Sequence, residues 1–350
     1  MAHYPEHIVG KAAQRPWKSI ATFPVGTFLE NLAVRANGSL LVASMLAGEI
    51  YFLDPHATDV QSTICRLHQF VPENVAQDNP EPGAWGGGMM CAAIVEDTRT
   101  EDVFYALSGI HGQAGSWGVY KLDLRFFDSD GTTKVQKHAT VPWALWLNGA
   151  AFIPGTSKLV MAESLGGRLS SLDVDTGDVE IWLDNNLLDK LTDRAEWPAA
   201  NGLKFNGENV YVTNSDRGLL LRARFDGITG KCIGDKVTVM AEGCAGDDLA
   251  FDIEGNVYVA TNPNQTVLKF FGVRAPGAER VEDRFIVAGG FECTETAGPT
   301  AVAFGRTSGD EQSLYVVTTG GLLAPIGEAP GPARVLRVDV GVKGAPLLFP

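Results

Sequence analysis

The chain has 350 residues, with 28 Lys and Arg against 42 Asp and Glu, which gives a formal net charge of −14. A phosphate backbone is bound through clusters of Lys and Arg, so this balance argues against a nucleic-acid partner. Hydrophobic residues make up 45% and charged residues 20%, as in ordinary globular proteins. No apolar run approaches the roughly 18 residues of a membrane-spanning helix, so membrane insertion is not expected.

Short strands rich in β-branched and aromatic residues recur about every 50 residues, near the period of propeller blades. In chain order they begin at Leu40, Val103, Lys158, Asn209, Asn256 and Ser313. Each follows a strand with small residues, beginning at Asn31, Met90, Gly149, Gly202, Asp248 and Thr300. Each precedes a third strand that often ends on Asp, as at Asp54, Asp123, Asp173, Asp226 and Asp339.

Outer strands are predicted at residues 65–70, 135–141, 179–183, 236–241 and 283–287. The sixth is expected from residues 21–24, so that the N- and C-terminal segments together close the ring. The pattern predicts an all-β, six-bladed β-propeller with four-stranded antiparallel blades around a central channel. We expect one domain over residues 1–350, with an N-terminal extension at 1–18. A short helical insertion is expected at 185–196, between the third and fourth blades.

The five cysteines lack C-x-x-C spacing, so a zinc site is not expected. Cys232 and Cys244 could form a disulfide, although buried free thiols are favoured. Residues 1–7 lack the apolar core of a signal peptide, which favours a cytoplasmic protein, or a secreted one if a leader has been removed.

The residues directly before the innermost strands converge on the central channel at one face of such a ring. They are Glu30, Met89 or Met90, Asn148, Asn201, Asp247 and Thr300. Two carboxylates and two amides in this set offer oxygen ligands, which suit Ca²⁺ or another divalent cation but not zinc or copper. Asn-Gly is also a common turn dipeptide, so the two asparagines could be turn residues alone, like Asn37. The two asparagines, however, occupy the same position before the innermost strand of their blades as Glu30 and Asp247 do in theirs. This agreement favours a metal site formed by Glu30, Asn148, Asn201 and Asp247.

Large apolar residues gather before the second and third innermost strands, and loops on the same face add further side chains. The predicted substrate-binding residues are Trp85, Met89, Met90, Trp117, Trp143, Trp146, Asn214, Asp216 and Thr300. Trp and Met around a cavity suit a bulky hydrophobic small molecule, although any one of them could instead pack blade against blade. His111, in a long loop, is a candidate catalytic residue beside Asp247 and Glu30; the alternative is a surface histidine without a role.

The chain resembles the regucalcin/gluconolactonase-like (senescence marker protein) family of six-bladed propellers over roughly residues 20–340. The motifs that carry the resemblance are Leu29-Glu30-Asn-Leu-Ala-Val, Leu147-Asn148-Gly149, Ala200-Asn201-Gly202-Leu203 and Gly246-Asp247-Asp248-Leu-Ala-Phe. The resemblance implies that Glu30, Asn148, Asn201 and Asp247 occupy metal-ligand positions. Asp248 stands where the family usually has Gly, and Asn31-Leu32 where Pro is usual, which points away from a sugar lactone as substrate.

The stretch Phe23-Pro-Val-Gly-Thr-Phe-Leu-Glu30 and the long second-blade insertion are similar to the fungal natural-product branch of this superfamily. That branch includes hetero-Diels–Alderases, which join a tropolone quinone methide to a sesquiterpene such as humulene. The resemblance therefore implies a pericyclase acting on hydrophobic small molecules, without an organic cofactor.

Two alternatives remain open at this stage. The first is a Ca²⁺-dependent lactonase or ester hydrolase of the gluconolactonase type, in which Asp247 or Glu30 acts as base or nucleophile. The second is a non-catalytic binding propeller, which is disfavoured because carboxylates converging on the axis serve no partner-binding purpose.

Overall fold

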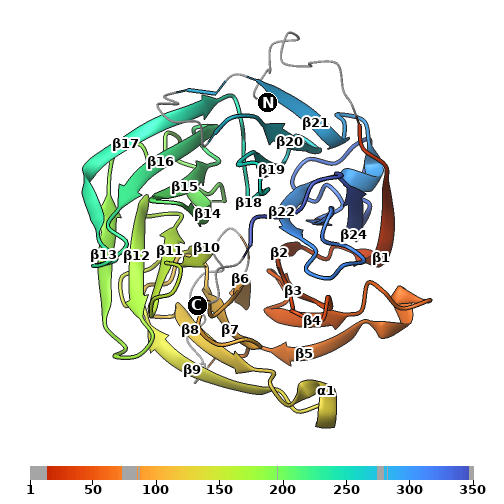
Figure 1. Ribbon diagram of the computed structural model, residues 1–350, viewed down its shortest axis with the longest axis horizontal. Helices are drawn as coiled ribbons and strands as arrows, with labels where there is room; N and C mark the ends of the chain where they lie inside the picture. The colour runs from red at the N-terminus through yellow and green to blue at the C-terminus, as the bar shows by residue number, and fades with distance from the viewer. Residues whose placement is uncertain are drawn as a thin grey trace.

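Six four-stranded antiparallel sheets surround a common axis in the computed structural model (Figure 1). The structure describes residues 14–72, 85, 87–194, 196–273, 280–281 and 283–346. In five of the sheets the strands pair in chain order, beginning with the strand nearest the axis. The predicted six-bladed β-propeller is confirmed.

Each blade takes one strand from each of four concentric layers. The innermost strands are β2 (Leu29–Val34), β6 (Met89–Glu96), β10 (Leu147–Phe152), β14 (Ala200–Asn206), β18 (Leu249–Phe251) and β22 (Pro299–Phe304). The second strands are β3 (Leu40–Ser44), β7 (Val103–Ile110), β11 (Lys158–Glu163), β15 (Asn209–Asn214), β19 (Val257–Thr261) and β23 (Ser313–Thr318). The third strands are β4 (Glu49–Leu53), β8 (Gly118–Asp123), β12 (Arg168–Asp173), β16 (Leu219–Phe225), β20 (Thr266–Phe270) and β24 (Pro332–Asp339). The outer strands are β5 (Cys65–Gln69), β9 (Lys134–Thr140), β13 (Val179–Asp184), β17 (Cys232–Glu242), β21 (Arg284–Gly289) and β1 (Trp17–Val25).

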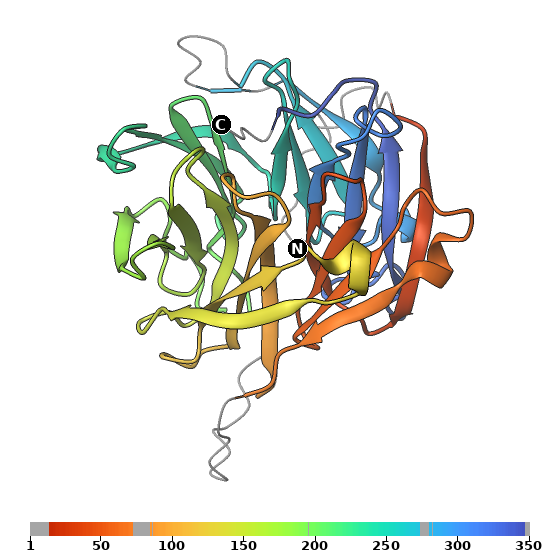
Figure 2. The same cartoon turned by 60° about the horizontal axis from the view of Figure 1, so that its bottom comes forward.

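The ring closes where the two ends of the described chain meet in the sixth blade. β1 pairs antiparallel with β24, with Trp17 opposite Val338 and Val25 opposite Pro332. Figure 2 shows this red strand lying along the blue sheet. The sixth outer strand therefore comes from the N-terminal segment, as predicted. It begins inside the region expected to be an extension, and residues 1–13 of that region lie outside the described residues.

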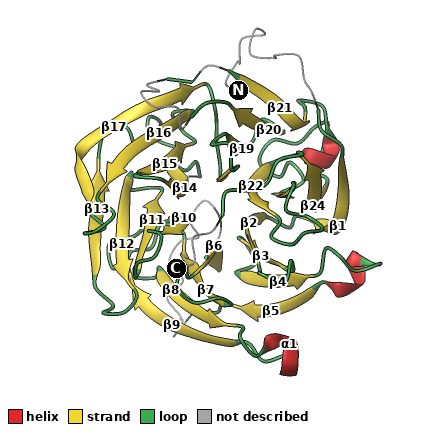
Figure 3. Cartoon of the chain, viewed as in Figure 1, coloured by secondary structure: helices red, strands yellow, loops and turns green. Residues whose placement is uncertain are grey.

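The helical segments among the described residues are short and lie outside the ring (Figure 3). The segment α1 (Phe127–Asp130) is α-helical, and the other segments are 3₁₀ helices. The helix expected at residues 185–196 is a wrong prediction, because the described part of this segment forms turns and bends. Side chains from the fourth blade bind its backbone groups instead. Asn214 Nδ2 donates to Leu187 O at 2.9 Å, and an Asp216 carboxylate oxygen accepts from Leu191 N at 2.5 Å. These hydrogen bonds use backbone C=O and N–H groups that would bond to each other within a helix.

All five cysteines are free thiols, so Cys232 and Cys244 form no disulfide. Cys91 and Cys244 are buried, as free thiols often are, and burial raises the pKa of Cys244 to about 12. No helix in the described part of the chain has both the length and the apolar character needed to cross a membrane.

Candidate functional site

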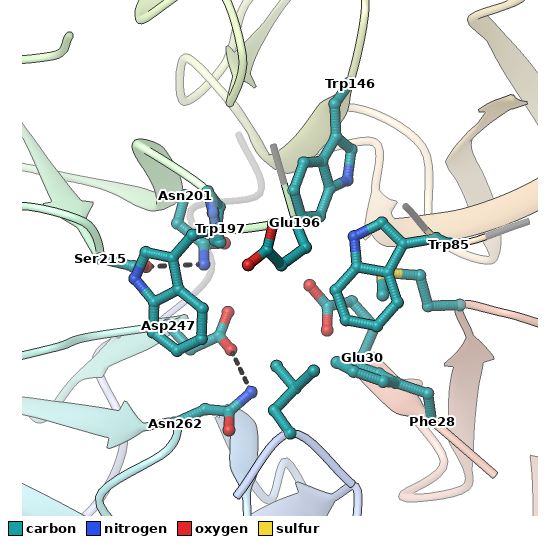
Figure 4. Close-up of a pocket in the computed structure, with 13 residues that line it drawn as sticks. Phe28, Glu30, Trp85, Trp146, Glu196, Trp197, Asn201, Ser215, Asp247 and Asn262 are labelled. Atoms are coloured by element: carbon teal, nitrogen blue, oxygen red, sulfur yellow. Dashed lines mark hydrogen bonds between the residues drawn. The ribbon is translucent and has the colours of Figure 1, made fainter. Parts of the chain in front are cut away.

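Four polar side chains meet at one end of the axis, where the innermost strands begin, and Figure 4 shows three of them, Glu30, Asn201 and Asp247. Glu30 lies in β2, Asn148 in β10 and Asn201 in β14, and Asp247 comes shortly before β18. All four are at most 5% exposed. Because Asn148 and Asn201 lie within strands, they are not turn residues, and the turn interpretation of the two Asn-Gly dipeptides is rejected.

The glycine after each of these asparagines is required by the close approach of neighbouring blades. A Cβ atom on Gly149 would lie 2.5 Å from the backbone oxygen of Asn201, and one on Gly202 would lie 2.5 Å from that of Asp247. Real Cβ atoms do not approach backbone oxygens this closely, so a larger residue would force the blades apart. The spacing of the innermost strands thus depends on the same motifs that supply the polar side chains.

The two axial carboxyl groups share a buried space that disfavours their charged forms. Burial, followed by the negative charges of Asp247 and Asp248, raises the pKa of Glu30 well above its ordinary value, while the Asn148 amide opposes the rise. Burial and the charge of Asp248 likewise raise the pKa of Asp247, opposed by the amides of Asn262 and Asn201. These directions follow from the penalty on a buried charge and from like-charge repulsion.

A third carboxylate, Asp248, already has its counter-charge. Lys204 Nζ lies 2.7 Å and 2.8 Å from the two Asp248 oxygens, and Asn31 Nδ2 donates to one of them at 3.1 Å. Among the described residues, no Lys or Arg pairs with Glu30 or Asp247, and Glu30 Oε2 has no hydrogen-bond partner. Two negative charges therefore remain uncompensated at the axis when both groups are ionised.

This donor set fits a hard divalent cation. The described residues contain no cluster of three or more His, Cys, Asp or Glu side chains arranged to hold a metal. Two carboxylates with two amide side chains are a different set, which suits Ca²⁺ when waters or a ligand complete its 6–8 oxygens. The unpartnered Glu30 Oε2 and the two uncompensated charges are what such an ion would satisfy.

The carboxylates open into a small chamber with polar groups on its floor and aromatic groups on its walls. The floor contains Glu30, Asn201, Ser215, Asp247 and Asn262, and the walls contain Phe28, Met45, Trp85, Trp146, Trp197, Pro198 and Leu323, with Glu196 beside them. The cavity measures about 20 Å³ for the centre of a water-sized sphere. One water needs about 10–15 Å³ by that measure, so in this conformation the side chains nearly fill the chamber.

The structure brings some of the predicted site residues to this chamber. Glu30, Asn201, Asp247, Trp85 and Trp146 line it. Asn148 lies beside Glu30. His111 is buried and packs edge-on against the Trp146 ring, with the centroids 4.8 Å apart, so it supports the wall and is not a surface histidine.

Other predicted substrate-binding residues bond to the protein itself and do not line the chamber. Trp117 Nε1 donates to the backbone oxygens of Ile110 and Leu145. Thr300 Oγ1 donates to Leu29 O at 2.6 Å and so joins the sixth blade to the first. Trp143 Nε1 donates to a serine hydroxyl at 3.1 Å. The remaining members of this group are Asn214 and Asp216, which hold the loop described above, and Met89 and Met90, which pack in the core between blades.

Five residues that the sequence pattern did not place at the site also line the chamber: Phe28, Glu196, Trp197, Ser215 and Asn262. Ser215 and Asn262 each directly follow a second strand, β15 and β19, so a comparison of those positions between blades could have found them. Glu196 and Trp197 lie in or next to the segment wrongly expected to be helical, so nothing in the sequence placed them at the axis.

The Lys204–Asp248 pair supports the base of the site, and its removal has a predictable cost. We expect Lys204→Met to lower the free energy of unfolding by about 2–3 kcal/mol, because the buried Asp248 would lose its cation, while the partial exposure of Lys204 keeps the loss below that of a fully buried pair. Lys158→Met is the matched control, since Lys158 pairs with the exposed Glu180 at 3.1 Å and should contribute only about 0–1 kcal/mol. Denaturant unfolding measures both, and equal losses would contradict the assigned role.

The chain is similar to two curated proteins named as hetero-Diels–Alderases. It is 23% identical to one from Phoma sp over 352 aligned positions, covering 93% of this chain and 91% of that protein. It is 23% identical to one from Sarocladium schorii over 321 positions, covering 86% and 77%. No family model matches the chain.

Solved structures of the same architecture agree with the fold. A luciferin-regenerating enzyme superposes with a TM-score of 0.64 at 16% identity, covering 95% of this chain and 97% of that one. Regucalcin from Agrobacterium tumefaciens gives 0.57 at 16% identity, covering 94% and 98%. A gluconolactonase gives 0.56 at 10% identity, covering 98% of each. The resemblance to regucalcin/gluconolactonase-like propellers and hetero-Diels–Alderases is thus confirmed, and the names of these relatives indicate an enzyme.

Proposed function

We propose that the protein is a pericyclase of the hetero-Diels–Alderase kind in natural-product biosynthesis. Its substrates would be a tropolone-derived quinone methide and a sesquiterpene such as humulene. The observation that supports this proposal best is the chamber, in which four aromatic side chains face a floor of carboxylate, amide and hydroxyl groups. Aromatic walls suit a hydrocarbon partner, and a polar floor suits the adjacent oxygens of the tropolone ring.

A hetero-Diels–Alder addition needs positioning more than acid–base chemistry. One C–C bond and one C–O bond form as six π electrons rearrange, and no proton is gained or lost. Holding two partners in a near-attack geometry can contribute up to about 7–11 kcal/mol of the barrier. In this proposal the walls orient the terpene, and the floor fixes the direction of the tropolone oxygens.

A divalent cation, Ca²⁺ being the best match, belongs to the same proposal. Its ligands would be Glu30, Asn148, Asn201 and Asp247. When bound, such an ion supplies positive charge that polarises a ligand oxygen. The chain itself keeps the two carboxylates buried and without a compensating positive charge among the described residues. Trp85 and Trp197, which are half-buried, exclude water from the chamber.

In this conformation the chamber holds little more than one water, so it has no room for the proposed substrates. We therefore propose that binding displaces an aromatic side chain of the wall. Trp197 is the candidate, because it is half-buried, whereas Trp146 and Phe28 are at most 3% exposed. Side chains with solvent on one side can change rotamer without opening the core.

Hydrolysis of a lactone or ester is the second candidate, favoured by the two buried carboxyl groups. A water would attack the carbonyl carbon, the C–O bond would break, and the departing oxygen would take a proton. Glu30 or Asp247 could accept the proton of the attacking water, because burial raises the pKa of both groups well above the ordinary values and so makes each carboxylate a stronger base.

One experiment separates the two candidates. The protein is incubated with a quinone-methide precursor plus humulene, and separately with a panel of lactones and aryl esters, each with and without a chelator. We expect enzyme-dependent adduct, detected by liquid chromatography and mass spectrometry, to exceed the background reaction with one stereoisomer enriched. Chelator-sensitive ester turnover without adduct would refute the cycloaddition proposal in favour of hydrolysis.

A further inference from the structure

Two tryptophans of the chamber wall carry buried N–H groups without an acceptor. Trp85 Nε1 and Trp146 Nε1 are shielded from solvent, and neither has a hydrogen-bond partner among the described residues. Three other tryptophans, Trp117, Trp143 and Trp182, donate their indole N–H to a backbone or hydroxyl oxygen at 2.8–3.1 Å. A buried N–H without a partner costs about 1–3 kcal/mol, so two in one cavity require an explanation.

The two indole rings are neighbours, and their nitrogens are on facing sides. The ring centroids are 6.4 Å apart with the planes inclined by 60°. Figure 4 shows the nitrogen of each ring on the side turned towards the other tryptophan, at the edge of the chamber. Two donors that face each other in this way can bind one oxygen atom, or two adjacent oxygens, of a molecule placed between them.

Neighbouring groups hold the Trp146 donor in place. Its backbone N–H donates to Glu163 Oε1 at 3.1 Å, and its ring packs against His111 at a centroid distance of 4.8 Å. Trp85 packs edge-on against Phe28, with the centroids 5.8 Å apart. Because donors held by their surroundings lose little freedom on binding, such a pair is suited to recognising a ligand oxygen.

We propose that Trp85 and Trp146 form a two-donor site for a carbonyl or enol oxygen of the ligand. The chemical class follows from the charges. Indole N–H groups are neutral donors, and no Lys or Arg of the described residues lines the chamber, so a neutral conjugated ketone fits better than a carboxylate or phosphate. This inference rests on the proposed function, because it assigns one substrate atom to one part of that site.

The pair would also favour the proposed reaction. A hydrogen bond to the carbonyl oxygen of an oxadiene draws electron density from the diene, which makes addition of an electron-rich alkene easier. The six π electrons rearrange into one new C–C and one new C–O bond, and both protons remain on the indole nitrogens. The interaction therefore needs no proton transfer and no co-reactant.

The test compares an oxygen-bearing probe with an oxygen-free one. Tropolone and humulene are titrated by calorimetry, at one fixed calcium concentration, into wild type, Trp85→Phe and Trp146→Phe, which keep an aromatic ring but lose the N–H. Each variant should weaken tropolone binding roughly five- to tenfold, the value of one buried hydrogen bond. Humulene binding should change less than about twofold, because a hydrocarbon accepts no such bond.

Two matched controls separate the loss of these two donors from the loss of an indole N–H elsewhere. Trp143→Phe removes an N–H that donates to Ser170 Oγ, and Trp182→Phe removes one that donates to Gly230 O, both away from the chamber. Neither should change tropolone binding more than about twofold, and thermal unfolding confirms that each variant is folded.

Several outcomes would overturn the donor pair. These are equal losses for tropolone and humulene, a loss of tropolone binding in Trp143→Phe or Trp182→Phe as large as in the Trp85 and Trp146 variants, or no tropolone binding by the wild type. Failure of the proposed cycloaddition is a separate result. If the wild type binds tropolone through the two indoles but forms no adduct, the donor pair stands and the reaction assignment falls.

Discussion

Replacing Asp247 with Asn should abolish the stabilisation of the protein by calcium and reduce its activity at least 100-fold. At a calcium concentration 100 times the dissociation constant, the wild type should gain about 2.7 kcal/mol in free energy of unfolding. Asp247→Asn should gain close to none, because one of the two charges that attract the ion is gone. The loss of activity follows if the ion or the carboxylate positions the substrate oxygens.

The stability of Asp247→Asn without calcium shows whether the substitution removes a metal ligand or simply destabilises the fold. Without calcium, Asp247→Asn should be as stable as the wild type or more so, because burial disfavours the ionised form of Asp247, and the charge of Asp247 adds to the cost of ionising Glu30. Chemical unfolding with a chelator and with calcium measures both effects. Thr300→Val is the control, since Thr300 occupies the equivalent position in the sixth blade but hydrogen-bonds to Leu29 O. A calcium response that survives in Asp247→Asn would contradict the ligand set.

Metal-free protein should lose stability as the pH rises from about 4 towards neutrality. The pKa values of Glu30 and Asp247 are raised above their ordinary values of 4.5 and 3.8, so the folded state holds protons that the unfolded state releases. Stability is therefore fully present below those ordinary values and declines as the pH passes through the raised ones. Calcium should flatten the profile, because a bound cation favours the ionised carboxylates.

Calorimetry of chelator-treated protein at several pH values tests this dependence. The double variant Glu30→Gln/Asp247→Asn is the control, and subtracting its profile removes other titrating groups. One of these is His68, whose pKa is lowered by burial, so that its contribution falls as the pH falls. A difference profile that rises with pH would show that the two carboxylates are stabilised as anions in the metal-free fold.

The repeating strand pattern predicted most of the fold because each blade is built mainly from contacts close in sequence. Alternating apolar residues and turn residues repeat in every blade, so the innermost strands and the residues before them could be placed in register. The same register identified Glu30, Asn201 and Asp247, which line the chamber, and Asn148 beside Glu30.

The hydrogen-bond partners of individual side chains were much harder to predict from the sequence. Thr300 and Trp117 occupy promising positions, but backbone oxygens brought close by folding accept their hydrogen bonds. Trp197 reaches the axis because Asn214 and Asp216 hold the preceding segment as a non-helical loop. Local helical preference was misleading there, since it contains no information about side chains of the next blade.

By itself, the sequence determined the six-bladed architecture, its closure by the N-terminal strand, and the ring of polar positions that contains Glu30. These depend on periodicity and residue type, which are properties of the chain alone. Only the tertiary structure decided which charges are compensated, since Lys204 neutralises Asp248 and leaves Glu30 and Asp247 without a cation among the described residues. It also decided which indoles are unpartnered, because a hydrogen bond depends on distances between atoms far apart in sequence.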